Sequence, residues 1–169
     1  MALTVETGIG VAGADSYDSL AAVDAFHAAR GNTAWAAADA AAREAALREA
    51  TDYLDIWHIN GGPRSSSLQG LNFPYEGTDD ANMDLIRIRK ALALLAPVAL
   101  SSTVVGGAVE TAQVLSATDK VGDISESRTY ADNSNSVTVL GGVDVSFLSQ
   151  LLNGLGSSGG MVIGHRHRG

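Results

Sequence analysis

Cysteine is absent from this chain of 169 residues, and aromatic side chains make up only 5% of it. Without cysteine, the chain can form neither disulfide bonds nor thiolate metal sites. Alanine supplies much of the 46% apolar content and buries little surface area, so the hydrophobic core should be thin for this length. We therefore expect part of the chain to need a partner before it becomes ordered.

Positive charge is scarce as well. The chain has 11 lysine and arginine residues against 19 aspartate and glutamate residues, a formal net charge of −8. A protein that grips nucleic-acid phosphates needs a basic surface, because lysine and arginine must replace the condensed counterions. The charge balance therefore argues against general DNA binding.

Long apolar runs are also missing. The longest, residues 91–100, contains Pro97 and is far shorter than the roughly 20 residues that a membrane-spanning helix needs. The first residues have neither the basic region nor the apolar stretch of a secretory signal peptide. We expect no contact with a membrane.

What the chain does contain is apolar residues at helical spacing, bounded by caps and turn residues. Ser19, Asp39, Asp79 or Asp80, and Asp144 are the predicted helix N-caps. The predicted helices cover residues 20–30, 40–59, 81–96 and 145–153, with one helical turn at 33–38. Strand-like segments follow at 112–116, 121–130 and 137–140, with turns at 118–119 and 131–135.

These elements predict a mainly α protein, a small helical bundle with a β-hairpin or short antiparallel strands and an extended C-terminal tail. The expected divisions are an extended segment 1–15, a helical bundle 16–100, a β-hairpin region 101–142, a short helix 143–156 and a flexible tail 157–169.

Side-chain spacing predicts which faces are buried. One stripe of the second long helix holds Leu47, Ala50, Leu54 and Trp57, and a near-heptad seam of the third holds Leu85, Ile88, Leu92, Leu95 and Ala99. The third helix should bend or stop at Pro97, because proline removes the hydrogen bond to Ala93. The loop 61–80 is rich in large apolar residues and should lie against the helices.

Two glycine motifs lack the context that their chemistry requires. Gly154-x-Gly156-x-x-Gly159 matches a dinucleotide fingerprint, but no strand precedes it and no helix follows it. Gly156-x-Ser158-x-Gly160 fails as a nucleophile elbow for the same reason. Both indicate a linker, and we expect no catalytic residues and no cofactor.

Several residue types could carry chemistry, and each also has a structural interpretation. Asp52, Asp55, Asp79 and Asp80 could supply a general acid and base, but they are more typical of a solvated helix face and a helix cap. Trp35, Trp57, Phe73 and Tyr75 could stack on bases, but without interleaved cations they are more typical of a core. His27 and His58, near helix ends, are more typical of structural histidines.

The C-terminal segment is the best candidate for a binding function. An apolar triplet is followed by four cationic or titratable side chains, which suits a peptide that orders on a partner with an apolar groove and an acidic rim. Ordinary terminal disorder is the alternative, and a metal site at His165 and His167 is disfavoured by the neighbouring arginines. The candidate docking residues are Met161, Val162, Ile163, His165, Arg166, His167 and Arg168.

A set of short motifs in fixed order carries a family resemblance over about residues 14 to 130. They are Asp-Ser-Tyr-x-Ser-Leu at 15–20, His-Ala-Ala-Arg-Gly at 27–31, Ala-Trp at 34–35, the helix 43–55, Gln-Gly-Leu-Asn-Phe-Pro at 69–74 and Lys-Val-Gly-Asp-Ile-Ser at 120–125. In these motifs the chain resembles the head–tail connector (adaptor, or head-completion) proteins of tailed bacteriophages. The same family also carries the label DnaT-like single-stranded-DNA-binding protein.

The resemblance implies a structural virion protein, made in the host cytoplasm and located in the neck. It implies a ring, usually of twelve copies, between the portal protein and the next neck, stopper or tail protein. Packaged double-stranded DNA would pass through the lumen without specific binding. The candidate tail would then dock on the portal. Two alternatives stay open, a single-stranded-DNA-binding module and, with less in its favour, a small enzyme or an enzyme's regulatory subunit.

Overall fold

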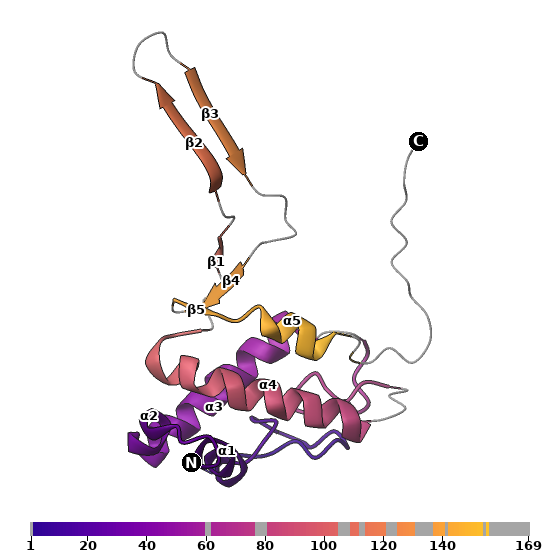
Figure 1. Ribbon diagram of the computed structural model, residues 1–169. Helices are drawn as coiled ribbons and strands as arrows, with labels where there is room; N and C mark the ends of the chain where they lie inside the picture. The colour runs from indigo at the N-terminus through magenta and orange to yellow at the C-terminus, as the bar shows by residue number, and fades with distance from the viewer. Residues whose placement is uncertain are drawn as a thin grey trace.

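The computed structural model describes residues 2–59, 62–76, 81–104, 109–111, 114–120, 125–130, 137–140, 142–153 and 155. The fold is mainly α, as the helical periodicity predicts. Figure 1 shows the helices gathered into one body, from which two antiparallel strands, β2 (Val114–Lys120) and β3 (Ser125–Tyr130), stand off. We call the helices and their connecting loops the helical domain, and β2 with β3 the arm.

The first two helices begin at side-chain caps. α1 (Leu20–Ala28) starts after Ser19, whose hydroxyl oxygen accepts a hydrogen bond from the Ala22 N–H at 3.2 Å, as predicted. α2 (Thr33–Ala37) is the predicted single turn, and the Asn32 side chain caps it. Between them Gly31 adopts a φ of +66°, a left-handed conformation that glycine takes without steric cost.

α3 (Ala40–Trp57) begins after the predicted cap Asp39, which accepts from the Ala42 N–H at 2.8 Å. Its predicted buried stripe is confirmed except at the last position, because Trp57 is 57% exposed. The helix ends at Trp57, two residues earlier than predicted, and the fully buried Ile59 of the following turn fills the core instead.

α4 (Ala81–Ser101) contains Pro97 and does not stop there, contrary to one form of the prediction. Proline lacks a single N–H donor, so only the Ala93 carbonyl loses its hydrogen bond within the helix. The turns on both sides of Pro97 are buried, including Leu95 and Val98. Packing of these turns outweighs the lost hydrogen bond.

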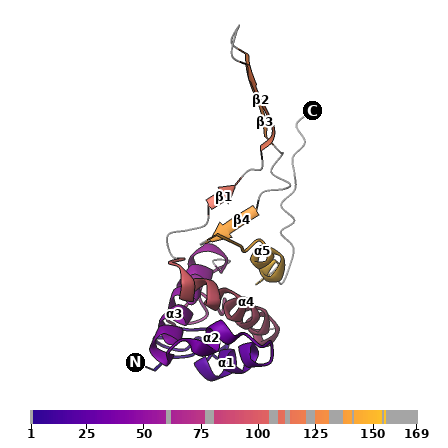
Figure 2. The same ribbon diagram turned by 60° about the vertical axis from the view of Figure 1, so that its left-hand side comes forward.

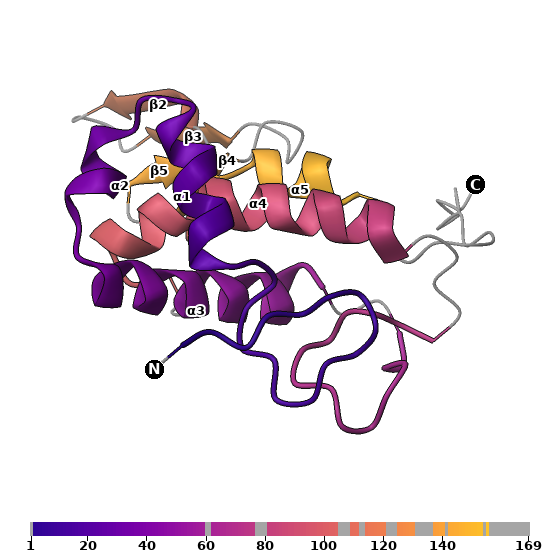
Figure 3. The same ribbon diagram turned by 90° about the horizontal axis from the view of Figure 1, so that it is seen from below.

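The core lies where α3 and α4 run side by side (Figure 3). The predicted near-heptad seam of α4 is confirmed, since all five of its residues are buried. The largest fully buried side chains around it come from several segments, and they include Trp35, Tyr17, Phe73, Leu47, Leu54, Ile59, Ile88, Leu92 and Leu95.

Two loops, residues 2–18 and 62–76, lie against each other at one end of the helical domain (Figure 3). The Gly70 N–H donates to the Val11 carbonyl at 3.1 Å, and Ala12 pairs with Gln69 in an isolated bridge. A Cβ on Gly70 would sit 2.2 Å from the Ala14 carbonyl oxygen, so this approach requires glycine. Backbone hydrogen bonds and close packing therefore hold the two loops together.

The apolar residues of the second loop are mostly buried, as predicted. Leu71, Phe73 and Tyr75 have at most 5% of their surface exposed. Leu68 is the exception, with 74% of its surface exposed. It lies in a turn in which the Gln69 N–H donates a hydrogen bond to the Ser66 carbonyl.

The strands form two sheets. β1 (Val109–Thr111) pairs with β4 (Val137–Leu140), which pairs with β5 (Val143–Asp144), and all pairings are antiparallel. The arm is a separate two-stranded sheet, seen almost edge-on in Figure 2. The predicted turn at Thr118 and Asp119 is wrong. Both residues lie inside β2, because the β2–β3 register continues to Lys120.

The last helix, α5 (Phe147–Leu152), starts two residues later than predicted. Asp144 does not cap it, and its carboxylate instead accepts from the Ser146 N–H at 2.8 Å in the turn before the helix. Leu148 and Leu152 are buried against the core. α5 lies along α4, as Figures 1 and 2 show.

Candidate interaction surface

The arginines of the helical domain bind within the chain. Their partners are carboxylates, an amide oxygen and backbone carbonyls. The contacts are Arg43 with Asp24 and Arg48 with Asp15, each at 2.7 Å, Arg64 with Asn72 at 2.9 Å, Arg87 with the Leu151 carbonyl at 3.0 Å, and Arg89 with the carbonyls of Tyr17 at 3.0 Å and Glu6 at 3.2 Å. Of these arginines, Arg43 and Arg48 are paired with carboxylates at 2.7 Å, whereas Arg30 and Lys90 of the same domain are exposed.

Asp55 is not part of a solvated helix face, which corrects the prediction. It is half-buried, and one of its carboxylate oxygens accepts hydrogen bonds from the Tyr17 hydroxyl and, at 2.8 Å, from the Asn72 N–H. Burial raises the pKa of Asp55, and these two hydrogen bonds oppose that rise. The arrangement ties three segments together.

The other predicted carboxylates differ in their placement. Asp52 is exposed, as predicted, and its pKa is raised by partial burial of its carboxyl and by the nearby charges of Glu49 and Asp15. Asp79 and Asp80 lie outside the described residues. The structure therefore brings no pair of these four carboxylates into a shared cleft among the residues that it describes.

Of the four aromatic residues predicted to lie in the core, three do so. Trp35, Phe73 and Tyr75 are buried, which confirms the core interpretation for these three. The Trp35 indole N–H also donates to Asp24 at 2.7 Å. Trp57 is exposed at the end of α3, so the core interpretation is wrong there.

His27 and His58 are structural, as predicted. The His27 ring is buried and lies 4.9 Å from the Trp35 ring, centroid to centroid. Its Nε2 has no hydrogen-bond partner among the residues that the structure describes. The nearby Ala93 carbonyl raises the pKa of His27. Burial has the larger effect, and the net result is a lowered pKa. The pKa of His58 is lowered by burial alone.

An exposed apolar stripe runs along the outer face of α4, and spacing did not single it out because the buried seam dominates the pattern. Met83 and Ile86 are 56% and 58% exposed. Lys90 and Leu94 continue the line at intervals of four residues, which places all four on one side of the helix. We call these four residues the outer stripe.

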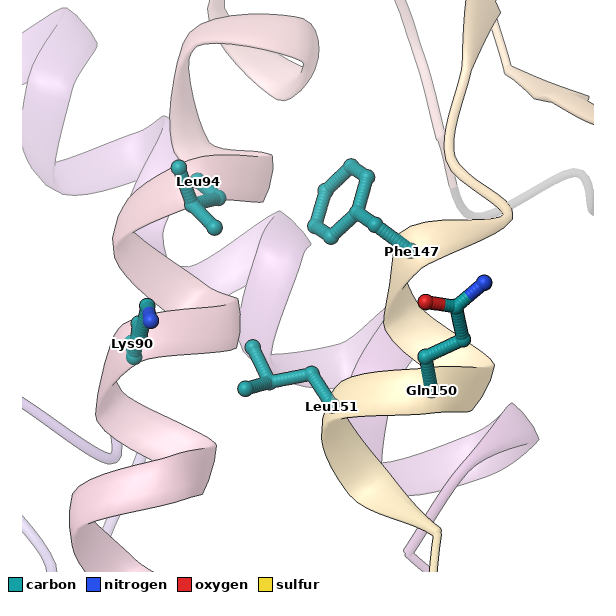
Figure 4. Close-up of a pocket in the computed structure, with 5 residues that line it drawn as sticks. All are labelled: Lys90, Leu94, Phe147, Gln150 and Leu151. Carbon is teal, nitrogen blue, oxygen red and sulfur yellow. The ribbon is translucent and has the colours of Figure 1, made fainter.

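The outer stripe continues into a shallow groove between α4 and α5. Figure 4 shows Lys90 and Leu94 facing Phe147 and Leu151 across it, with Gln150 at the rim. The groove has a volume of about 370 Å³. Its lining is mainly apolar, a surface typical of protein or peptide contacts.

Other kinds of site are absent from the described residues. They contain no group of three or more histidine, cysteine, aspartate or glutamate side chains that could hold a metal ion. No helix among them is both long and apolar enough to cross a bilayer. The candidate docking residues 161–168 lie outside the described part of the chain, so their role stays a prediction.

Comparison with known families gives one match that covers the whole chain. The model of the family described as "Putative DnaT-like ssDNA binding protein" matches residues 1–169. The chain belongs to this family. No curated protein and no solved structure is a match for the chain. Nothing in these comparisons links it to head–tail connectors.

Proposed function

We propose that this member of the family is a structural subunit of a tailed bacteriophage. In this proposal it is a head–tail connector that forms a ring, of twelve copies as in the resembling proteins, between the portal and the neck or tail. It works by fitting between other proteins in the virion neck and performs no catalysis. Packaged DNA passes through the lumen.

The arm is the observation that carries this proposal. It forms a two-stranded sheet of its own, standing off the helical domain (Figure 1). An isolated pair of strands is only marginally stable in water. Its outer edges have no pairing partner among the described strands, and such edges pair readily with another chain. In a ring, the arm of the next copy supplies that partner.

Charge supports the same proposal. A net charge of −8 on each copy repels DNA phosphates, so a DNA molecule in the lumen can slide without adhering. The ion pairs of Arg43 and Arg48 also limit the positive charge that the helical domain presents to DNA. The candidate docking residues 161–168 suit contact with an acidic portal surface through their two arginines.

Single-stranded-DNA binding is the second candidate, and the family description supports it better than it supports the connector. The cations for it would include Lys120 and Arg128 in the arm and Arg166 and Arg168 near the C-terminus. For a protein that neutralises about four phosphates of a single strand, the logarithm of the binding constant should fall against the logarithm of the salt concentration with a slope of roughly −3.

Two measurements on the same purified chain separate these functions. Negative-stain electron microscopy, with and without the portal protein of the same virus, tests for rings stacked on the portal. Titration of a labelled single-stranded oligonucleotide at two salt concentrations tests for DNA binding. Stacked rings with no salt-dependent oligonucleotide binding support the connector. Tight, salt-dependent binding without affinity for the portal would overturn the connector and support the second candidate.

A further inference from the structure

The outer stripe and the groove beside it form one apolar surface that the described part of the chain leaves open. On α4 it extends from Met83 to Leu94, a distance of roughly 16 Å at the helical rise. The far wall is made by Phe147 and Leu151 of α5. Apolar surface of this kind is commonly covered by another segment or chain.

The same chain carries a segment that can reach this surface. The described part ends at Leu155, just after α5, and Arg87 holds the end of α5 beside α4 through the Leu151 carbonyl. Residues 156–160 have the glycine and serine composition of a linker, and Met161 to Ile163 follow. Six residues of extended chain span roughly 20 Å, enough to bring the triplet onto the outer stripe.

Charge favours this occupant over a neutral apolar peptide. Without Arg166 and Arg168, the rest of the chain has a formal net charge of −10 rather than −8. The approach to α4 and its first turn are acidic in sequence, with Glu76, Asp79, Asp80 and Asp84. The two arginines would complement the net negative charge of the rest of the chain, although Asp84 itself already pairs with Arg87 at 3.6 Å.

We propose that Met161, Val162 and Ile163 dock on the α4–α5 groove of their own chain. The linker gives the triplet a local concentration on the order of millimolar, far above that of a second copy in dilute solution. The proposal concerns the chain alone and does not rest on the function proposed above. A partner that binds the triplet, such as a portal, would compete with this docking.

The absence of cysteine allows a direct test. Gln150→Cys at the groove rim and Gly164→Cys beside the triplet are introduced together in the full chain. A disulfide between them requires their Cα atoms to come within roughly 4–7 Å. In dilute oxidising solution, we expect an intrachain disulfide in the monomer, detected by a non-reducing gel and by mass spectrometry.

The matched control carries the same two cysteines together with Val162→Asp, which places a charge in the triplet and leaves the folded domain unchanged. Docking predicts that the disulfide forms about tenfold more slowly in this control. Equal rates in the two proteins would refute docking. Disulfides that form mainly between chains, at a rate that rises with protein concentration, would also refute it, because the occupant would then be a second copy.

Discussion

The Tyr17 hydroxyl donates a hydrogen bond to the carboxylate of Asp55, across 38 residues of sequence. The same carboxylate oxygen accepts from the Asn72 N–H, so the segment before α1, the end of α3 and the second loop meet at one atom. Burial is the main cause of a strongly raised Tyr17 pKa, with the Asp55 charge second. At neutral pH the tyrosine is therefore the donor and the aspartate the acceptor.

Asp55→Asn should change how stability depends on pH. Because the pKa of Asp55 is raised in the folded state, the folded protein binds the proton more tightly than the unfolded chain does. The contribution of Asp55 to wild-type stability should therefore rise as pH falls through its folded pKa, and level off below the unfolded value of about 3.9. In Asp55→Asn this rise should be absent. Urea denaturation at several pH values measures it.

Asp55→Ala is the companion variant, because it removes the acceptor as well as the charge. Leaving the two buried donors without a partner should cost about 2–3 kcal/mol of unfolding free energy at pH 7. Asp55→Asn keeps an acceptor oxygen and should cost less. Equal losses in the two variants would contradict the role of the hydrogen bonds.

Glu6→Gln should destabilise the first loop. The Glu6 side chain is fully buried, and its carboxylate accepts backbone N–H groups from Gly8, Ile9, Gly10 and Val11 at 2.8–3.1 Å. A glutamine offers one oxygen and turns an N–H donor toward the remaining donors. We expect a loss of about 1.5–3 kcal/mol, the range for a hydrogen bond to a charged group. Chemical denaturation measures it.

The matched control for this variant is Glu76→Gln, the same change at an exposed glutamate. Its unfolding free energy should stay within about 0.5 kcal/mol of the wild-type value. A similar loss in both variants would mean that net charge, rather than the backbone contacts of Glu6, sets the effect.

His27→Gln should remove a loss of stability at acid pH. Burial lowers the pKa of His27 in the folded state, with the Arg30 charge adding to it and Asp24 opposing it. Relative to the variant, the wild type should therefore lose stability as pH falls from about 6.5, the unfolded value, toward the lower folded pKa. This is opposite in sign to the effect of Asp55. A difference in unfolding free energy between wild type and variant that stays constant from pH 7 to pH 5 would contradict this interpretation.

Removal of the arm should separate folding from assembly. Thr111 of β1 lies opposite Val137 of β4, so an Asn-Gly turn in place of residues 112–136 joins them as a two-residue hairpin. The shortened chain should keep its helical circular dichroism and a melting temperature within about 4 °C of the wild type. It should form no rings in electron micrographs.

The control for the arm deletion is a chain that ends after Leu155 and keeps the arm. This chain should still form rings, though it should lose contact with the portal. Rings formed by the armless chain would contradict the assembly role that we propose for β2 and β3.

Local patterns were sufficient to predict much of the helical domain. Ser19 and Asp39 cap their helices as predicted, because a cap depends on residues only three positions apart. The seam of α4 was predictable from spacing alone. Trp57 and Pro97 were not, since exposure at a helix end and the continuation of a helix through proline depend on what packs nearby.

The polar contacts that fasten the domain could not be predicted from the sequence. Asp55 and its exposed neighbour Asp52 lie in similar sequence surroundings. Only the hydrogen bonds that Asp55 accepts from Tyr17 and Asn72 distinguish the two. Arg89 contacts carbonyls that lie 72 and 83 residues earlier. No pattern of neighbouring residues indicates such partners. The outer stripe of α4, by contrast, was visible in the spacing but masked by the stronger inner seam.

The reach of Arg89 has a consequence for synthesis on the ribosome. Its guanidinium holds the backbone of Glu6 and Tyr17, so the first loop lacks this support until α4 has left the exit tunnel. More than half of the chain is translated by then. The amino-terminal segment should therefore be among the last parts of the helical domain to resist proteases during translation, although it is made first.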